Sequence, residues 1–302
     1  MKYSLIGDPH ITHKSLDRAT ELNALLEYFK TSKLFHTIIV GNHDYFNLEC
    51  EGHSLEALKL LPNVLVIDEP TNDEDFVFIP YMHDQQKLKA TIAKFVNPKK
   101  TLIGHLELSQ FDFGNGHICT TGLSVTDVAG FKRVISGHFH KYQTQGNLTY
   151  LGTPFSHSFG EANQVKYLGM YDSVTDELKI AETPFPKHIS IEFNCDLLDE
   201  HGSHWFNQID LNDPNHQKHF YRIILTGQQI NIDRFPKHIY DGGTHGKLNI
   251  KWISRPSDYM ENQITIEDTV SNERQFMKWA TEVRGMDEET VKLGLSIMEA
   301  CR

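Results

Sequence analysis

The sequence predicts an α/β fold in which a sheet flanked by helices is completed by a second sheet layer. From residue 1 to about residue 190, short β-rich runs alternate with helical or loop segments, which is typical of an α/β fold. Several of these runs end in a glycine, so the chain can turn sharply there. From Tyr142 onward the pattern changes to hairpins, which predict that another sheet packs on the first.

Candidate strands and helices alternate in the first half of the chain. Residues 15–30 carry apolar side chains at helical spacing, which predicts a helix, and residues 84–96 are predicted to form another. The candidate strands are residues 3–6, 37–40, 64–67, 76–79, 101–103 and 134–135. Because a predicted helix lies between the first two strands, a parallel β–α–β crossover is expected there.

Two hairpins are predicted in the part of the chain that forms the second sheet layer. Gly146 and Asn147 form a turn between two β-like runs. Residues 173–177 form another turn, between strands at 166–171 and 178–181.

Two prolines, Pro184 and Pro186, predict a domain boundary. The first domain is therefore expected at residues 1–188, and a small α+β domain at residues 189–256. A linker and C-terminal helices are expected at residues 257–302. Within the small domain the predicted elements are strands at 220–225 and 247–252 and a helix near 228–235.

Residues 272–300 are predicted to form two helices that break at Gly285 and Met286, with Asp287 as the N-cap of the second helix. Their apolar side chains lie on one stripe of each helix, as expected for helices that pack against another surface. These side chains are Phe276, Trp279, Ala280, Val283, Val291, Leu295 and Met298.

Composition narrows the classes of function. No apolar run is long enough to cross a bilayer, and Asp8 comes too early for a signal peptide, so a cytoplasmic protein without membrane contact is expected. The four cysteines form no Cys-x-x-Cys pair, which indicates reduced thiols rather than a disulfide framework or a structural zinc site. The net charge of -11 disfavours nonspecific binding to phosphate backbones. A DNA enzyme with this charge needs metal ions, a local basic patch or a basic partner.

Four short motifs with metal-ligand side chains follow predicted strands. Strand ends are where ligands bind in α/β sheets, and histidine is the commonest metal ligand. Any one of the 18 histidines is more often a surface or packed side chain, so the order of all four motifs is the specific signal. The motifs are Asp8-Pro9-His10, Gly41-Asn42-His43-Asp44, Gly104-His105 and Gly137-His138-Phe139-His140.

The types of side chain in these motifs indicate which ions they fit. Imidazole, carboxylate and amide ligands suit manganese, iron or zinc, and the lack of a thiolate argues against a structural zinc site. Two such ions a few ångströms apart can clamp a phosphate and activate a water molecule. The motifs therefore predict a two-metal phosphoesterase site.

In these residues the sequence resembles the calcineurin-like metallophosphoesterases. Residues 150–161, Tyr-Leu-Gly-Thr-Pro-Phe-Ser-His-Ser-Phe-Gly-Glu, also resemble the segment that follows Gly-His-x-His in the SbcD-type DNA repair nucleases, a group that includes T-even bacteriophage recombination nucleases. The resemblance covers roughly residues 1–190 well and the C-terminal third in outline. It implies a two-sheet sandwich flanked by helices, with a small α+β capping domain and C-terminal helices.

The resemblance also implies an activity and partners. They are manganese-dependent cleavage of DNA, as exonuclease and single-strand endonuclease, and a complex with an SbcC-type coiled-coil ATPase that contains a homodimer of this chain. Asp8, His10 and His140 would hold one manganese ion, and Asn42, His105 and His138 the other. His43 would protonate the leaving oxygen or stabilise the phosphorane, with Asp44 orienting the imidazole.

The sequence departs from the family pattern at one place. The family's Gly-Asp-x-x-Asp motif, whose first Asp bridges both ions, is missing, and the nearby acids Asp17, Glu21 and Glu27 are expected to be solvated on a helix. The second ion would then have only neutral ligands, so binding of mainly one ion is expected. In the family the interval around the missing motif also contains a strand and a second helix, and the loss of that strand predicts exposed apolar surface or an unpaired sheet edge. Two alternatives stay open: a catalytically impaired subunit that binds DNA and the ATPase, and a metallophosphoesterase that acts on another phosphoester.

Overall fold

The computed structural model describes residues 2–5, 18–197, 217–235, 249–256, 287 and 291–292. The chain divides into two compact units, and each is considered by itself. One unit comprises Met1–Phe193, Leu198–Ile224 and Pro236–Ile253, and the other comprises Asn194–Leu197, Leu225–Phe235 and Ser254–Arg302. The predicted boundaries near residues 188 and 256 stay predictions. None of the described helices is both long enough and apolar enough to span a membrane.

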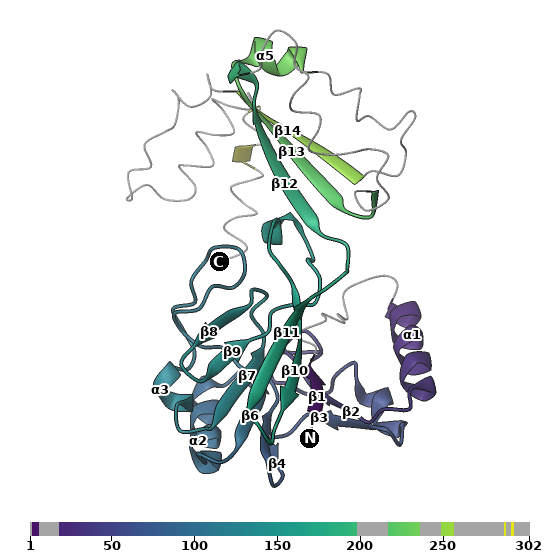
Figure 1. Cartoon of the computed structure of the whole chain (residues 1–302), viewed down its shortest axis with the longest axis vertical. Coiled ribbons are helices and arrows are strands. Elements are labelled where there is room, and N and C mark those ends of the chain that lie inside the picture. The colour runs from purple at the N-terminus through teal and green to yellow at the C-terminus, as the bar shows by residue number, and fades with distance from the viewer. Residues whose placement is uncertain are drawn as a thin grey trace. The chain divides into compact units, whose positions relative to one another are not determined.

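A six-stranded sheet, in the order β4-β5-β6-β7-β9-β8, forms the centre of the first unit (Figure 1). The strands β5, β6, β7 and β9 run parallel, and β4 and β8 pair antiparallel with their neighbours. The strands are β4 (Thr71–Asn72), β5 (Phe76–Ile79), β6 (Thr101–His105), β7 (Arg133–Gly137), β8 (Gln143–Gln145) and β9 (Leu148–Tyr150). The predicted strands at 76–79, 101–103 and 134–135 and the turn at Gly146 are thus confirmed. The placement of this hairpin in the second sheet layer was wrong, because β9 pairs with β7 and so extends the central sheet.

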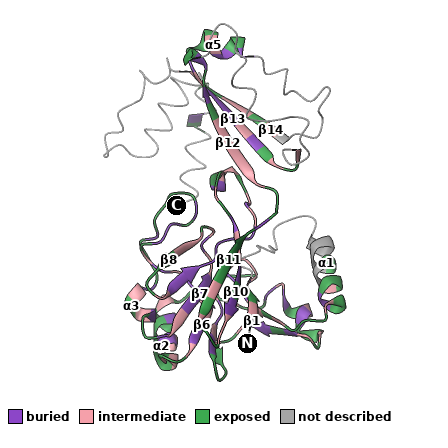
Figure 2. Ribbon diagram, viewed as in Figure 1, coloured by how far each residue is buried: buried purple, intermediate pink, exposed green. Residues whose placement is uncertain are grey.

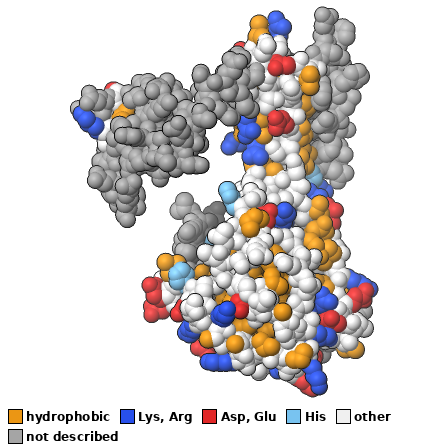
Figure 3. All heavy atoms as spheres, turned by 90° about the vertical axis from the view of Figure 1, so that its left-hand side faces the viewer, with side chains coloured by type: hydrophobic (Ala, Val, Ile, Leu, Met, Phe, Trp, Pro, Cys, Tyr) orange, Lys and Arg blue, Asp and Glu red, His pale blue; other side chains and the backbone are white. Residues whose placement is uncertain are grey.

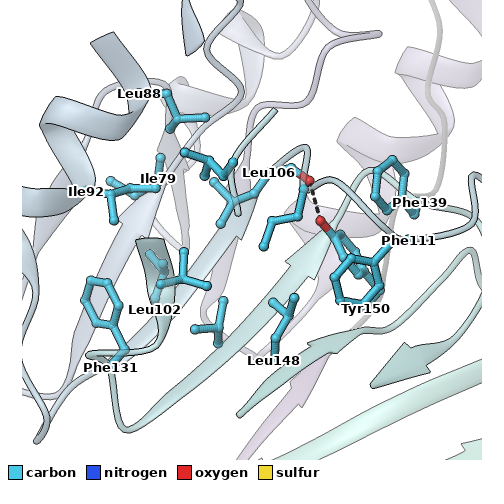
Figure 4. Packing of buried hydrophobic residues seen from close by; sticks show 14 of the residues in the cluster. Ile79, Leu88, Ile92, Leu102, Leu106, Phe111, Phe131, Phe139, Leu148 and Tyr150 are labelled. Atoms are coloured by element: carbon cyan, nitrogen blue, oxygen red, sulfur yellow. Dashed lines mark hydrogen bonds between the residues drawn. The ribbon is translucent and has the colours of Figure 1, made fainter. Parts of the chain in front are cut away.

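One face of this sheet is covered by α2 (Gln85–Phe95) and the short α3 (Val125–Val128). The carboxylate of Asp84 begins α2, because it accepts hydrogen bonds from two backbone N–H groups of the first turn. Leu88 and Ile92 lie one helical turn apart and are buried in the main hydrophobic core (Figure 4). The same core includes Val77, Ile79, Leu102, Leu106, Phe139, Leu148 and Tyr150.

The opposite face is covered by a three-stranded antiparallel sheet of β1 (Lys2–Leu5), β10 (Tyr167–Asp172) and β11 (Glu177–Glu182). Side chains alternate along a strand, so Val134 of β7 joins the core beneath α2, whereas Ile135 packs with Tyr171 of β10. The strands β6 and β7 are accordingly mostly buried, and α2 exposes its outer side (Figure 2). The predicted α/β class is confirmed.

A polar clamp joins these two sheets. The hydroxyl of Tyr171 on β10 bonds Thr101 Oγ1 on β6 at 2.8 Å and donates to Asp176 Oδ1 at 2.8 Å. Arg133 of β7 donates from Nε to the same Asp176 oxygen at 3.0 Å. Burial raises the pKa of Asp176, but the hydrogen bonds from Arg133 and Tyr171 outweigh it and hold the pKa below its ordinary value.

A smaller body holds α1 (Arg18–Thr31), β2 (His36–Ile39) and β3 (Val64–Ile67), with the 3-10 helix η1 (Glu56–Leu60) in the long connection. The strands β2 and β3 pair in parallel as a two-stranded sheet. The body has its own hydrophobic cluster, formed by Phe29, Val40, Tyr45, Leu55, Leu58, Val64 and Val66. It meets the six-stranded sheet where Tyr81, just past β5, donates its N–H to the Val40 carbonyl at 2.9 Å.

The predicted parallel crossover from residues 3–6 to residues 37–40 is wrong. β1 pairs antiparallel with β10, and β2 pairs with β3 in a different sheet. The reason is that Tyr3 and Leu5 of β1 pack between the two large sheets, which assigns β1 to the second layer.

Several apolar side chains are exposed on the α1–β2–β3 body, and their connection to a missing strand stays a prediction. Leu34 and Phe35, in the link from α1 to β2, are 66% and 67% exposed. Tyr28 of α1 and Leu65 of β3 are exposed as well.

A further three-stranded sheet follows in the order β12-β13-β14. Its strands are β12 (His188–Asn194), β13 (Phe220–Gly227) and β14 (Asn249–Pro256), and the short helix α5 is Gln229–Arg234. The predicted elements at 220–225, 228–235 and 247–252 are thus confirmed. The predicted C-terminal helices at 272–300 lie outside the described residues, apart from Asp287, Val291 and Lys292. Val291 donates its N–H to the Asp287 carbonyl at 3.1 Å.

Replacing Asp176 by Asn should lower the free energy of unfolding by about 1.5–3 kcal/mol, the usual contribution of a hydrogen bond to a charged group. The folded-state pKa of Asp176 is depressed, so this stabilisation is present at neutral pH and is lost as the pH falls below the ordinary value of 3.8. Urea unfolding between pH 7 and pH 3 should therefore show a smaller difference between wild type and Asp176→Asn at the acid end. The exposed Glu69 provides the control, Glu69→Gln, and an equal effect of both changes would contradict the clamp.

Candidate metal centre

The described candidate ligands gather at the carboxyl ends of β2, β6 and β7. His105 is the last residue of β6 and pairs in register with Gly137, the last residue of β7. His138 follows directly, and Asn42 lies three residues beyond the end of β2. The strands β6 and β7 are parallel neighbours and end at the same edge of the six-stranded sheet, whereas β2 belongs to the two-stranded sheet and brings Asn42 to that edge from outside it.

Asn42 and His105 are in direct contact. The distance from Asn42 Oδ1 to His105 Nε2 is 2.8 Å. This is the length of an ordinary hydrogen bond, in which the ring N–H donates to the amide oxygen, and it brings two metal-ligand atom types together at one point. Gly41 permits this approach, because a Cβ atom at that position would lie 2.7 Å from His105 Cε1.

His138 occupies a strained position beside this pair. Its φ of 89° lies in the left-handed region, which is uncommon for residues other than glycine. Its ring centroid is 5.2 Å from that of His105. Its Nε2 is buried without a hydrogen-bond partner among the described residues, and Glu107 Oε2 lies 3.5 Å away, beyond ordinary hydrogen-bond length. The contact with His138 is the main cause that lowers the pKa of Glu107 to about 2.

His140 is held by a buried ion pair. Its Nδ1 is 2.6 Å from Glu161 Oε1, and Lys166 Nζ is 2.7 Å from Glu161 Oε2. Glu161 belongs to the 3-10 helix η2 (Phe159–Glu161) and Lys166 directly precedes β10. Burial raises the pKa of Glu161, but hydrogen bonds with His140 and Lys166 outweigh it and bring the pKa to about 2. Burial lowers the pKa of Lys166.

The other predicted site residues are only partly described. Asp44 Oδ2 accepts a hydrogen bond from the Gly41 N–H at 2.8 Å, which closes the turn after β2. The predicted orientation of His43 by Asp44 stays a prediction. Asp8 and His10 lie outside the described residues, so the half of the centre that they would form with His140 stays a prediction too.

A separate group of possible ligands lies on the small α1–β2–β3 body. The ligand atoms of His53, Glu56 and Asp68 are all within 4.8 Å of one another. The ammonium group of Lys59, however, is 2.6 Å from Asp68 Oδ2 and 3.0 Å from Glu56 Oε2. Because a cation of the chain already neutralises both carboxylates, this group is an ion-pair network.

Sequence reasoning missed four residues around the site. Tyr81 follows β5, and its ring centroid is 6.1 Å from that of His105 and 6.0 Å from that of His138. Its position after a strand end was the available signal. Glu107 stands two residues after His105, the spacing of side chains that share a face of an extended chain. Glu161 and Lys166 gave no local signal of their contact with His140.

The fold and these contacts together define a mixed α/β protein with a candidate metal centre at the strand ends of its central sheets. No family model matches the sequence. The chain is 32% identical over 195 residues to exonuclease subunit 1 of Enterobacteria phage T4, an alignment that covers 61% of this chain and 55% of that protein. The chain therefore spans about half the length of this relative, and the similarity supports a distant relationship to nucleases.

Replacing Gly41 by Ala should separate His105 from Asn42, because the added methyl group collides with the imidazole ring. The free energy of unfolding should fall by about 1–3 kcal/mol, as in other overpacked sites. Manganese affinity should fall as well. Urea unfolding and calorimetric titration measure the two effects. The control is Gly160→Ala, whose methyl group would meet only Ser158 Oγ, at 3.3 Å. Unchanged manganese affinity in Gly41→Ala would contradict the pairing of Asn42 and His105 at one ion.

Proposed function

We propose that this chain is a metal-dependent DNA nuclease subunit with exonuclease and single-strand endonuclease activity. The observation that carries the proposal is the contact of Asn42 with His105 at the sheet edge that also bears His138 and His140. The similarity to T4 exonuclease subunit 1 supports the choice of DNA. The layers of two sheets with α2 outside them support a metallophosphoesterase sandwich as the scaffold.

We assign manganese as the resident metal. Asn42, His105 and His138 would hold one ion, and His140 would hold the other with Asp8 and His10. Bound manganese would supply Lewis acidity toward the phosphate and its attacking water. Of the chain's own groups, the His43 imidazole would deliver a proton to the leaving oxygen, and the Asp44 carboxylate would keep that ring oriented.

The two halves of the proposed centre differ in charge. His140 would share its ion with a carboxylate, that of Asp8, whereas Asn42, His105 and His138 are all neutral ligands. We therefore propose one strongly bound ion and one weakly bound ion. The same imbalance favours the alternative of a catalytically impaired subunit that binds DNA and a partner. Hydrolysis of a different phosphoester is the other alternative, and turnover of single-stranded DNA against a small phosphodiester separates it from the nuclease.

The proposed partners follow from the same relationship. The name of the T4 relative describes a subunit, and we propose that this chain also works in a complex, as a homodimer with an SbcC-type coiled-coil ATPase. Residues 257–302 are the proposed docking segment. Lys and Arg side chains are interspersed with Asp and Glu on the face that Figure 3 shows. Since that face carries both signs of charge and the chain has a net charge of -11, metal ions or a basic partner would help it to bind the DNA backbone.

Replacing His140 or Asp8 by Ala should remove the stronger manganese site and leave the fold intact. Isothermal titration calorimetry with manganese chloride should show the loss of the tight binding step, and cleavage of single-stranded DNA should fall with it. His36 lies at the other end of β2, so His36→Ala is the control. Undiminished manganese binding in both site variants would refute the proposed centre.

Replacing His43 by Asn should leave manganese affinity nearly unchanged and lower the rate of DNA cleavage. A general acid usually contributes about 10²–10⁴-fold to the rate, and the loss should lie in that range. Single-turnover cleavage at saturating manganese measures the rate, and calorimetry measures the affinity. A loss of manganese binding in this variant would instead identify His43 as a ligand.

A further inference from the structure

The two histidines of the Gly137-His138-Phe139-His140 turn each face a carboxylate, and they do so through different ring nitrogens. The Nδ1 atom of His140 lies 2.6 Å from Glu161 Oε1. The Nε2 atom of His138 lies 3.5 Å from Glu107 Oε2. The turn thus has one carboxylate behind each of its proposed ligands.

Glu161 determines which nitrogen of His140 carries a proton. Its carboxylate is 5% exposed and ionised, because Lys166 Nζ bonds its second oxygen at 2.7 Å. An ionised carboxylate only accepts hydrogen bonds, so the proton must sit on Nδ1 of His140. In the neutral ring the lone pair then sits on Nε2, which is the nitrogen that can ligate an ion.

The surroundings of Glu161 converge on His140 rather than on the loop alone. Lys166 Nζ also donates to the His140 carbonyl at 2.9 Å and to Thr153 Oγ1 at 3.0 Å. The Thr153 N–H donates to the same His140 carbonyl at 3.1 Å. The buried pair therefore fixes both the ring and the backbone of one residue, which a pair that only closes the loop would not need to do.

Glu107 has a matching place behind His138. Its Oε1 accepts a hydrogen bond from Thr121 Oγ1 at 2.7 Å, which leaves Oε2 facing His138. The chain passes very close at Gly122, where an added Cβ would lie 2.4 Å from the Glu107 carbonyl oxygen. No hydrogen bond of ordinary length joins Nε2 of His138 to this carboxylate, but the carboxylate attracts an N–H and repels a lone pair at 3.5 Å. The proton therefore belongs on Nε2, and the lone pair of the neutral ring is left on Nδ1.

We infer that Glu161 and Glu107 are positioning residues of the metal centre: Glu161 presents Nε2 of His140, and Glu107 presents Nδ1 of His138, to the ions. This inference rests on the proposed function, which supplies the identity of the bound ions. Carboxylate–histidine–metal arrangements raise the basicity of the ligand. Glu107 thereby passes negative charge, through His138, to the half of the centre whose ligands are all neutral.

The first test is nuclear magnetic resonance of metal-free protein labelled with ¹⁵N in histidine. At about pH 8.5, where histidine is ordinarily neutral, the ring nitrogen shifts report the tautomer directly. His140 should carry its proton on Nδ1 and His138 on Nε2, and the signals are assigned by their loss in His140→Gln and His138→Gln. The opposite tautomer at either histidine would overturn the inference for its carboxylate, with no variant of a glutamate needed.

The second test removes the carboxylates. Glu161→Leu combined with Lys166→Met replaces the buried ion pair by apolar groups, an exchange that folded proteins often tolerate. The His140 ring should then populate both tautomers, and manganese affinity by calorimetry should fall about 10–100-fold. Glu107→Leu should do the same at His138 and weaken the second ion. The control, Glu56→Gln, changes another carboxylate that contacts a histidine, His53, at 3.2 Å from its Nε2, and it should move neither readout.

The outcomes separate this inference from the proposed function. If the folded variants keep the wild-type tautomers and manganese affinity, both carboxylates are structural groups only, and the inference is wrong. If the wild type shows the expected tautomers but binds no manganese, the proposed function fails, whereas the control of the ring protons by Glu161 and Glu107 stands.

Discussion

The parallel register of β6 and β7 decides where the rest of the site lies. It sets His105 opposite Gly137, so the turn that carries His138 and His140 begins beside His105, at the ordinary spacing of neighbouring strands. On the other side of β7, β9 runs parallel as well and delivers the segment that contains Thr153 and Glu161 to the same edge. A slip of one residue in this pairing would turn these side chains to the opposite face.

Local features of the fold could be predicted from the sequence, and non-local ones could not. Short apolar runs identified β5, β6 and β7, and Gly146 identified the β8–β9 turn, because each of these signals lies within a few residues of the chain. The partner of β1 was not predictable from nearby residues, since it depends on which face Tyr3 and Leu5 bury. The contacts of Glu107 with His138 and of Glu161 with His140 were not predicted for the same reason. The two residues of each contact are 31 and 21 positions apart in the sequence (138 − 107 and 161 − 140).

The negative charges at the site lie on Glu107 and Glu161, which contact the proposed ligands His138 and His140 and are not proposed ligands themselves. The contacts of Glu107 and Glu161 lower the pKa of each carboxyl to about 2, so both are anions at neutral pH. Lys166 balances Glu161, while Glu107 has a hydroxyl and an imidazole as its near neighbours. In the proposed metal centre, this charge would compensate in part for the absence of a Gly-Asp-x-x-Asp motif from the sequence.

The division of the first unit between the α1–β2–β3 body and the six-stranded sheet has a consequence for how the protein opens. Each has its own hydrophobic cluster, and such bodies commonly unfold as separate cooperative segments, visible in amide hydrogen exchange. Asn42 belongs to the smaller body and His105 to the larger one. An ion bound by both Asn42 and His105 would connect the two bodies and stabilise only the form in which they are together. Amide exchange should then slow more in β2 and β3 than in the central strands. Amide exchange in the smaller body would then report on occupancy of the site.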